Sequence, residues 1–156
     1  MRSAGRIGPL EGSSAGEVRR QASARFTVAT PGPGFTDVTA PVAAFVRESG
    51  LHDGLVTVFC RHTSASLTIQ ENADPDVRTD LMTALDALAP RNRAYVHGME
   101  GPDDMPAHIR TMVTDSALVV PIVDGRLGLG TWQGVYLIEH RDRGHRRELI
   151  LHASGA

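Results

Sequence analysis

The chain contains no lysine, because all 16 of its basic residues are arginine. This absence excludes a lysine Schiff base and a lysine-containing phosphate loop as sources of catalysis. Any phosphate or carboxylate group of a substrate must therefore be held by arginine, backbone amides, hydroxyl groups or a metal ion.

Cysteine is nearly absent as well, since Cys60 is the only one in the sequence. A single cysteine excludes an internal disulfide and a cysteine-rich zinc site. Cys60 lies inside the apolar run Leu55–Cys60. We therefore interpret it as a small buried side chain rather than a nucleophile.

The sequence also lacks a strong charge and a long apolar run. Its net charge is −2 and its pI about 6.4, which gives no electrostatic footprint for nucleic acid or an anionic membrane. No run approaches the roughly 20 apolar residues that span a bilayer, and residues 1–17 have no apolar signal-peptide core. We expect a cytoplasmic protein that binds neither nucleic acid nor membrane.

The length of 156 residues and the 41% hydrophobic content are typical of one globular domain. Residues 1–23 are rich in glycine, serine, alanine and arginine and show little periodicity. We predict that they form a flexible extension without chemistry. The domain is then expected to occupy residues 24–156.

Residue patterns in this domain predict more strands than helices. The expected strands are 25–30, 35–38, 55–61, 67–70, 117–123, 135–140 and 147–152. Helices are expected after Thr39, after Asp74 and near Pro106, with Thr39, Asp74 and Asp104 as their caps. We predict an α+β fold with a largely antiparallel sheet and about three helices.

The segment Arg61–Asn72 is the most informative part of the sequence. It begins where an apolar run ends, and it presents a histidine, two serines, two threonines, a glutamate and an asparagine. The helix start at Asp74-Pro75 follows directly, and amides at a helix N-terminus favour an anion. On spacing alone, the segment suits a ligand site and a solvated turn equally well.

Four histidines lie at strand ends, in loops or beside carboxylates: His62, His97, His108 and His140. Neutral imidazole is a common metal ligand and a natural acid or base near pH 7. No local metal motif such as H-E-x-x-H is present, so a metal site would be assembled from distant segments. Without a G-x-S-x-G elbow, the nearby serines favour hydrogen bonding to an anionic ligand over acyl transfer.

Three ordered blocks resemble the signatures of the YjbQ family (UPF0047). They are His62-Thr63-Ser64-Ala65-Ser66-Leu67 with Glu71-Asn72 and Asp74-Pro75, then His97 with Glu100-Gly101 and Asp103 to Ile109, then Gly130 to Gly134 with Glu139-His140-Arg141. The resemblance implies a compact α+β fold that assembles as a homotrimer. It also implies secondary thiamine-phosphate synthase activity, which joins a pyrimidine methyl diphosphate to a thiazole phosphate and releases diphosphate.

The resemblance and this reaction together assign expected roles to individual residues. The expected catalytic residues are His62, His108 and His140. The expected ligands of a divalent metal, zinc or magnesium, are His97, His108 and His140. The expected contacts to phosphorylated substrates are Ser64, Ser66, Asn72, Arg78 and Arg141. Gly98 departs from the family pattern, because relatives can carry an acid at this position.

Two other functions remain open at this stage. The same polar groups would serve a metal-dependent hydrolase of a small phosphorylated metabolite. They would also serve a trimer that binds a ligand without catalysis.

Overall fold

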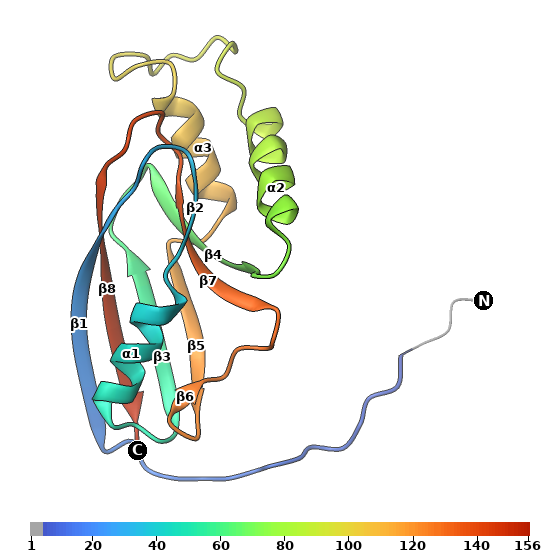
Figure 1. Ribbon diagram of the computed structural model, residues 1–156, viewed down its shortest axis with the longest axis vertical. Helices are drawn as coiled ribbons and strands as arrows, with labels where there is room; N and C mark the ends of the chain where they lie inside the picture. Colours follow the sequence, from blue (N-terminus) through green and yellow to red (C-terminus); the bar gives the residue numbers. More distant parts are fainter. Residues whose placement is uncertain (1–4) are drawn as a thin grey trace.

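The computed structural model describes residues 5–156 (Figure 1). In chain order, its elements are β1 Arg20–Ala29, β2 Gly34–Asp37, α1 Thr39–Ser49, β3 Gly54–Cys60, β4 Ala65–Glu71, α2 Pro75–Leu88, α3 Asp104–Val113, β5 Ala117–Val123, β6 Arg126–Leu127, β7 Gln133–Glu139 and β8 Arg146–Gly155. Among residues 5–156, no helix combines the length and the apolar character needed to cross a membrane.

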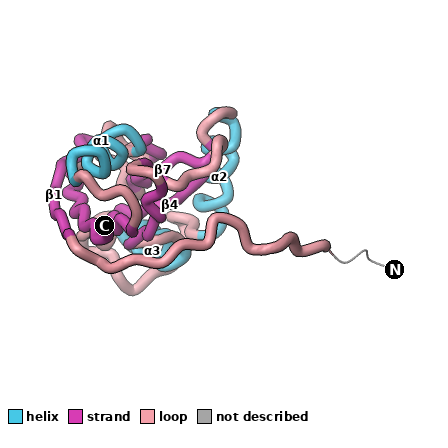
Figure 2. Tube along the Cα trace, turned by 90° about the horizontal axis from the view of Figure 1, so that it is seen from below, coloured by secondary structure: helices cyan, strands magenta, loops and turns pink. Residues whose placement is uncertain are grey.

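The strands form two antiparallel sheets. One has the order β1-β8-β3-β5-β6 and the other the order β2-β7-β4. Seen end-on, the strands curl around a common interior with α1 at one side (Figure 2). The predicted α+β fold with antiparallel pairing and three helices is confirmed, with two sheets in place of one.

The first strand begins earlier than its sequence pattern indicates. β1 starts at Arg20, and the amide of Arg19 already donates to the carbonyl of Gly155. Of the predicted extension, residues 1–4 lie outside the described part of the chain and residues 20–23 belong to β1. The reason is β8, which continues to Gly155 and pairs with every residue of β1.

Alternate residues of the strands and one face of α1 build the apolar core. Its fully buried members include Val42, Val46, Val56, Val58, Leu67, Val120, Val135, Leu137, Leu149 and Leu151. Cys60 belongs to this core, as predicted, and burial raises the pKa of its thiol. The helix α1 ends at Gly50, whose φ of 68° is a left-handed conformation that glycine adopts without strain.

Two of the three predicted helix caps are wrong by one residue. Asp74 caps α2 as predicted, accepting a hydrogen bond from the amide of Asp76. Thr39 instead lies inside α1, with Val38 at the cap, because its hydroxyl accepts from the amide of Val135 in β7. Asp104 lies inside α3, with Asp103 at the cap, because both carboxylates face neighbouring segments instead of the helix amides.

The five-stranded sheet carries apolar side chains on both faces of β5. Leu118, Val120 and Ile122 point into the core, while Ala117, Val119, Pro121 and Val123 are exposed. Two exposed residues of β3, Leu55 and Phe59, extend this surface. We call these six exposed residues the β3–β5 outer face.

The end of β7, the start of β8 and α3 lie at the end of the molecule opposite the C-terminus (Figure 1). Buried polar groups join these segments. The carboxylate of Glu139 has no exposed surface and pairs with Arg147 through two bonds of 2.6 Å. Burial alone would raise the pKa of Glu139. The hydrogen bond and the positive charge of Arg147 together have the larger effect, so the pKa of Glu139 lies below its ordinary value. This ion pair links β7 to β8, and Arg147 also donates to Ser64.

A second buried group, His140, attaches α3 to the sheet. Its Nε2 lies 2.7 Å from the hydroxyl of Ser66, which accepts a bond of 2.6 Å from Thr114 after the end of α3. Burial lowers the pKa of His140 to about 4, with a smaller contribution from the positive charge of Arg110. His140 is therefore neutral near pH 7.

The stability of the fold should depend on the protonation of His140. In the unfolded chain its imidazole binds a proton near pH 6.5, whereas in the folded chain it does so only near pH 4. Between these values the unfolded state binds more protons, so acidification from pH 6.5 to 4 should remove about 3 kcal/mol of stability. Urea unfolding followed by circular dichroism at several pH values measures this loss.

The control is His140→Gln, which keeps an amide near Ser66 but does not titrate. The difference in unfolding free energy between wild type and this variant should shrink as the pH falls, because only wild type loses the contribution. Parallel pH curves for the two proteins would contradict the role given to His140.

Candidate metal centre

Two of the predicted metal ligands meet at the start of α3. His97, from the loop that follows α2, lies 2.7 Å from the Oδ2 of Asp104 through its Nε2. The Nε2 of His108 lies 3.2 Å from the same oxygen. The potential ligand atoms of these three residues all lie within 4.8 Å of one another. We call His97, Asp104 and His108 the candidate metal centre.

The helix α3 brings two of the three side chains together. Asp104 and His108 are four residues apart in α3, so their side chains lie on the same face. The loop brings His97 to them, and the two imidazole centroids are 5.5 Å apart. The Asp104 side chain is 3% exposed, against 42% for His97 and 34% for His108. The centre is therefore a buried carboxylate beneath two imidazoles that solvent can reach.

The hydrogen bonds of His108 leave two acceptor atoms facing each other. Its Nδ1 lies 3.0 Å from the carbonyl oxygen of Thr63, which can only accept, so Nδ1 carries the proton. In the neutral ring, Nε2 then presents a lone pair to the carboxylate oxygen of Asp104. Such an arrangement requires a cation between the two atoms or a second proton on His108. These donor atoms therefore fit a metal ion.

Electrostatics keep the carboxylates of this region ionised. Burial raises the pKa of Asp104, but the hydrogen bond from His97 and the charges of Arg141 and His108 outweigh it, so the pKa lies below its ordinary value. The neighbouring Asp103 is also partly buried, yet hydrogen bonds from Arg141 and the amide of Asp142 lower its pKa to about 2. Both groups are anions at neutral pH, as metal binding requires.

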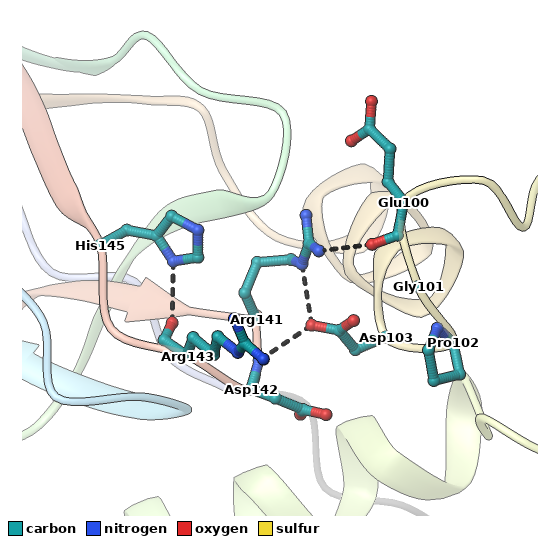
Figure 3. A pocket seen from close by; sticks show the side chains of 8 residues that line it. All are labelled: Glu100, Gly101, Pro102, Asp103, Arg141, Asp142, Arg143 and His145. Atoms are coloured by element: carbon teal, nitrogen blue, oxygen red, sulfur yellow. Dashed lines mark hydrogen bonds and ion pairs between the residues drawn. The ribbon is translucent and has the colours of Figure 1, made fainter.

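A polar cavity of about 530 Å³ adjoins the centre (Figure 3). It is lined by Glu100, Gly101, Pro102, Asp103, Arg141, Asp142, Arg143 and His145. Asp103 and Arg141 are shared between the cavity wall and the surroundings of Asp104. A small polar molecule in this cavity would therefore lie beside the candidate metal centre.

The structure places His140 away from the metal centre. It is fully buried, bonded to Ser66, and outside the group of ligand atoms described above. A side chain with no exposed surface cannot touch a ligand that enters from solvent. The direct catalytic and metal-binding roles predicted for His140, and the substrate contact predicted for Ser66, are therefore not supported by this arrangement.

His62 and Ser64 also lie outside the centre. The Nε2 of His62 accepts a hydrogen bond of 2.8 Å from the amide of Glu148, and partial burial, with the charge of Arg147, lowers its pKa. His62 lines a different cavity of about 520 Å³, and Ser64 accepts from Arg147. In this segment, the carbonyl of Thr63 is the group that reaches the metal centre.

Asn72 and Arg78 lie at the far end of β4. That strand has 7 residues, which correspond to about 23 Å of extended chain. Asn72 donates to the carbonyls of Thr131 and Gln133, and Arg78 donates to the carbonyl of Glu71 and stacks over Tyr136. Within one chain, these two predicted substrate contacts do not meet the histidines.

The sequence patterns assigned Asp104 to a helix cap and did not indicate it as a candidate metal ligand. The available signal was the spacing of Asp104 and His108, which puts both side chains on one helix face. The contribution of Asp103 had no comparable signal, because its partner Arg141 comes from a distant strand end.

Comparison with known proteins identifies the family of this chain. Residues 24–156 match the family described as UPF0047 protein YjbQ-like. A UPF0047 protein of Synechocystis is 55% identical over 137 residues, which cover 87% of this chain and 93% of that protein. The UPF0047 protein YjbQ of Salmonella typhimurium is 48% identical over 102 residues, covering 65% and 74% respectively.

Solved structures agree with the sequence comparison. The crystal structure of an uncharacterised YjbQ/UPF0047 protein from Clostridium acetobutylicum has 39% identity and a TM-score of 0.77, covering 82% of this chain and 97% of that one. A YjbQ-like protein of unknown function from Sulfolobus solfataricus has 22% identity and a TM-score of 0.83, covering 90% and 100%, and so shows the same fold. The chain belongs to the YjbQ-like UPF0047 family.

Proposed function

We propose that this protein is a metal-dependent enzyme that acts on phosphorylated small molecules. The observation that carries the proposal is the convergence of three potential metal ligands, His97, Asp104 and His108, within 4.8 Å of one another and beside a polar cavity. Two imidazoles and one carboxylate form a donor set typical of catalytic metal sites, which keep a coordination position for water or substrate.

The donor set favours zinc over magnesium. Magnesium prefers six oxygen ligands and usually retains several waters, whereas imidazole nitrogen suits zinc and other transition metals. When bound, such a cation neutralises charge on a phosphoryl or diphosphoryl group and lowers the pKa of a water molecule. The carbonyl of Thr63 supports this assignment, because it fixes the proton of His108 on Nδ1 and leaves Nε2 as a ligand.

We propose transfer of the thiamine-phosphate synthase type as the first reaction to test. In that reaction the bond between the pyrimidine methylene carbon and the diphosphate oxygen breaks, and the diphosphate leaves with the electron pair. The thiazole nitrogen donates its own pair to form the new carbon–nitrogen bond. The departing charge is the reason that a cationic centre would accelerate the step.

The cavity beside the centre can hold one phosphorylated partner. Arg143 lines the cavity, is exposed, and forms no ion pair with any residue of the described chain. It therefore offers a guanidinium group for a phosphate, whereas Asp142 is already paired with Arg91. The lack of lysine in the chain makes this arginine the natural anion contact of the cavity.

Hydrolysis of a phosphorylated metabolite is the second candidate. The specific observation in its favour is the donor set itself, because two histidines and one carboxylate also serve zinc hydrolases. The thiamine-type transfer and the hydrolysis share the metal centre and the cavity, and differ in whether the second substrate is a thiazole or water.

We also propose that the protein is a cytoplasmic homotrimer that assembles through the β3–β5 outer face. Leu55, Phe59, Val119 and Val123 are each between 42% and 57% exposed on this face. A surface of this composition on two adjacent strands is favourable to cover with another subunit. Assembly would also offer a way to bring Asn72 or Arg78 of one subunit toward the centre of another.

Metal content tests the centre directly. Purified wild-type protein should retain zinc after dialysis, while His97→Ala and His108→Ala should lose it, because each removes one of three ligands. Elemental analysis by mass spectrometry gives the ratio of metal to chain. The matched control is His152→Ala, which removes an exposed histidine bonded to Ser23 and should leave the metal content unchanged. Equal metal content in all four proteins would refute the centre.

Turnover tests the reaction. Wild type should form thiamine phosphate and diphosphate in equal amounts from the two substrates, and His108→Ala should be slower by about 100-fold or more. Phosphate release from single substrates, without thiamine phosphate, would establish the hydrolase instead. Binding without turnover of either kind would establish a ligand-binding protein. The variant His62→Ala should keep the metal, and a loss of its activity would restore the catalytic role predicted for His62.

Assembly can be tested by placing a charge on the β3–β5 outer face. Light scattering should give wild type three times the chain mass of 16.7 kDa. Val119→Glu should dissociate, because a carboxylate would be buried without a partner. Ile7→Glu changes an apolar side chain that is 99% exposed and serves as the control. A monomeric wild type, or a trimeric Val119→Glu, would exclude this assembly.

A further inference from the structure

Arg141, predicted as a substrate contact, is held by three hydrogen bonds within the protein. Its Nε donates to Asp103 over 2.8 Å, and its NH2 donates to the carbonyl of Glu100 over 2.9 Å (Figure 3). Its NH1 donates to the Oδ1 of Asp104 over 2.7 Å. Its side chain is 18% exposed. Each guanidinium nitrogen already has an acceptor, so only two of the five N–H groups, one on NH1 and one on NH2, remain for a phosphate group.

These three bonds join three separate segments of the chain. Arg141 follows β7, Glu100 lies in the loop between α2 and α3, and Asp103 and Asp104 begin α3. The same loop carries His97, three residues before Glu100. One planar group therefore fixes both the loop and the helix that supply the candidate metal ligands.

Arg141 also determines how the carboxylate of Asp104 is used. The Oδ1 of Asp104 faces Arg141, whereas its Oδ2 faces both His97 and His108. Holding Oδ1 fixes the plane of the carboxylate and directs Oδ2 toward the metal position. The negative charge of Asp103 neutralises the positive charge of Arg141. Arg141, Asp103 and Asp104 together therefore keep a net charge of about −1, which favours a bound cation.

We propose that Arg141 is a positioning residue that organises the metal centre, rather than a substrate-binding residue. The inference rests on the proposed metal centre. Lysine could not replace this arginine, because a single ammonium group cannot present a planar fork to two carboxylates and a carbonyl at once. Arg141 and Asp103 then form part of the cavity wall, on the side of the metal ligands that they hold in place. Arg143 remains the cation of the cavity that is available to a substrate.

The test compares Arg141→Lys and Arg141→Gln with Arg146→Gln. Arg146 begins β8, five residues after Arg141, is exposed, and makes no ion pair within residues 5–156. It therefore controls for loss of one positive charge. The probe is Co²⁺, whose visible absorption reports both its affinity and the geometry of its ligands. Circular dichroism confirms that each variant is folded.

Both Arg141 variants should bind Co²⁺ at least about tenfold more weakly than wild type, with an altered absorption spectrum. Arg146→Gln should match wild type in both. Hydrogen exchange of the metal-free proteins should be faster over residues 97–104 in the Arg141 variants, because the loop loses its attachment to β7. Wild-type affinity and spectrum in Arg141→Lys would overturn the inference.

The experiment also separates failure of this inference from failure of the proposed function. If wild type binds no Co²⁺, the metal centre falls and the support given by Arg141 is judged from hydrogen exchange alone. Unchanged exchange over residues 97–104 in both Arg141 variants would then reject it. If wild type binds Co²⁺ and both Arg141 variants bind it equally well, the metal centre is supported and the role proposed for Arg141 is rejected.

Discussion

The candidate site depends on one buried carboxylate, that of Asp104. With 3% of its side chain exposed, this anion is stable in the fold only because each of its oxygens has a positive or proton-donating neighbour. Arg141 satisfies one oxygen and the two histidines approach the other. Removing Arg141, or both histidines, would leave one oxygen of this buried carboxylate without compensation, so the helix start, the loop and the end of β7 are constrained together.

The sequence was sufficient to predict the fold class because local signals and tertiary structure agree in most elements. The pair Asp74-Pro75 starts α2, Gly50 ends α1, and Asp124-Gly125 turns the hairpin after β5. Errors occur where pairing overrides local preference. Ala153, Ser154 and Gly155 have little tendency to form a strand alone, yet they lie between β1 and β3 and are held by both.

The site was only partly predictable, because its residues come together through tertiary contacts. Family signatures identified His97 and His108, and the structure brings them within reach of one carboxylate. The signatures do not separate ligands from residues that support the fold. His140 and Ser66 lie in the matched blocks but are buried, and their hydrogen bond joins the end of β7 to β4. The bond from Thr114 to Ser66 then attaches the end of α3 to β4. Burial and register distinguish these roles, and neither is visible in residue spacing.

The apolar character of both faces of β5 carries a risk for the isolated chain. β5 pairs with β3 along most of its length but with β6 only at Ile122 and Val123, so part of its outer edge resembles a template for strand addition. Pro121 interrupts that edge, because it has no amide hydrogen to offer an incoming strand. The isolated chain is therefore less open to strand addition at this edge than its apolar surface alone would indicate.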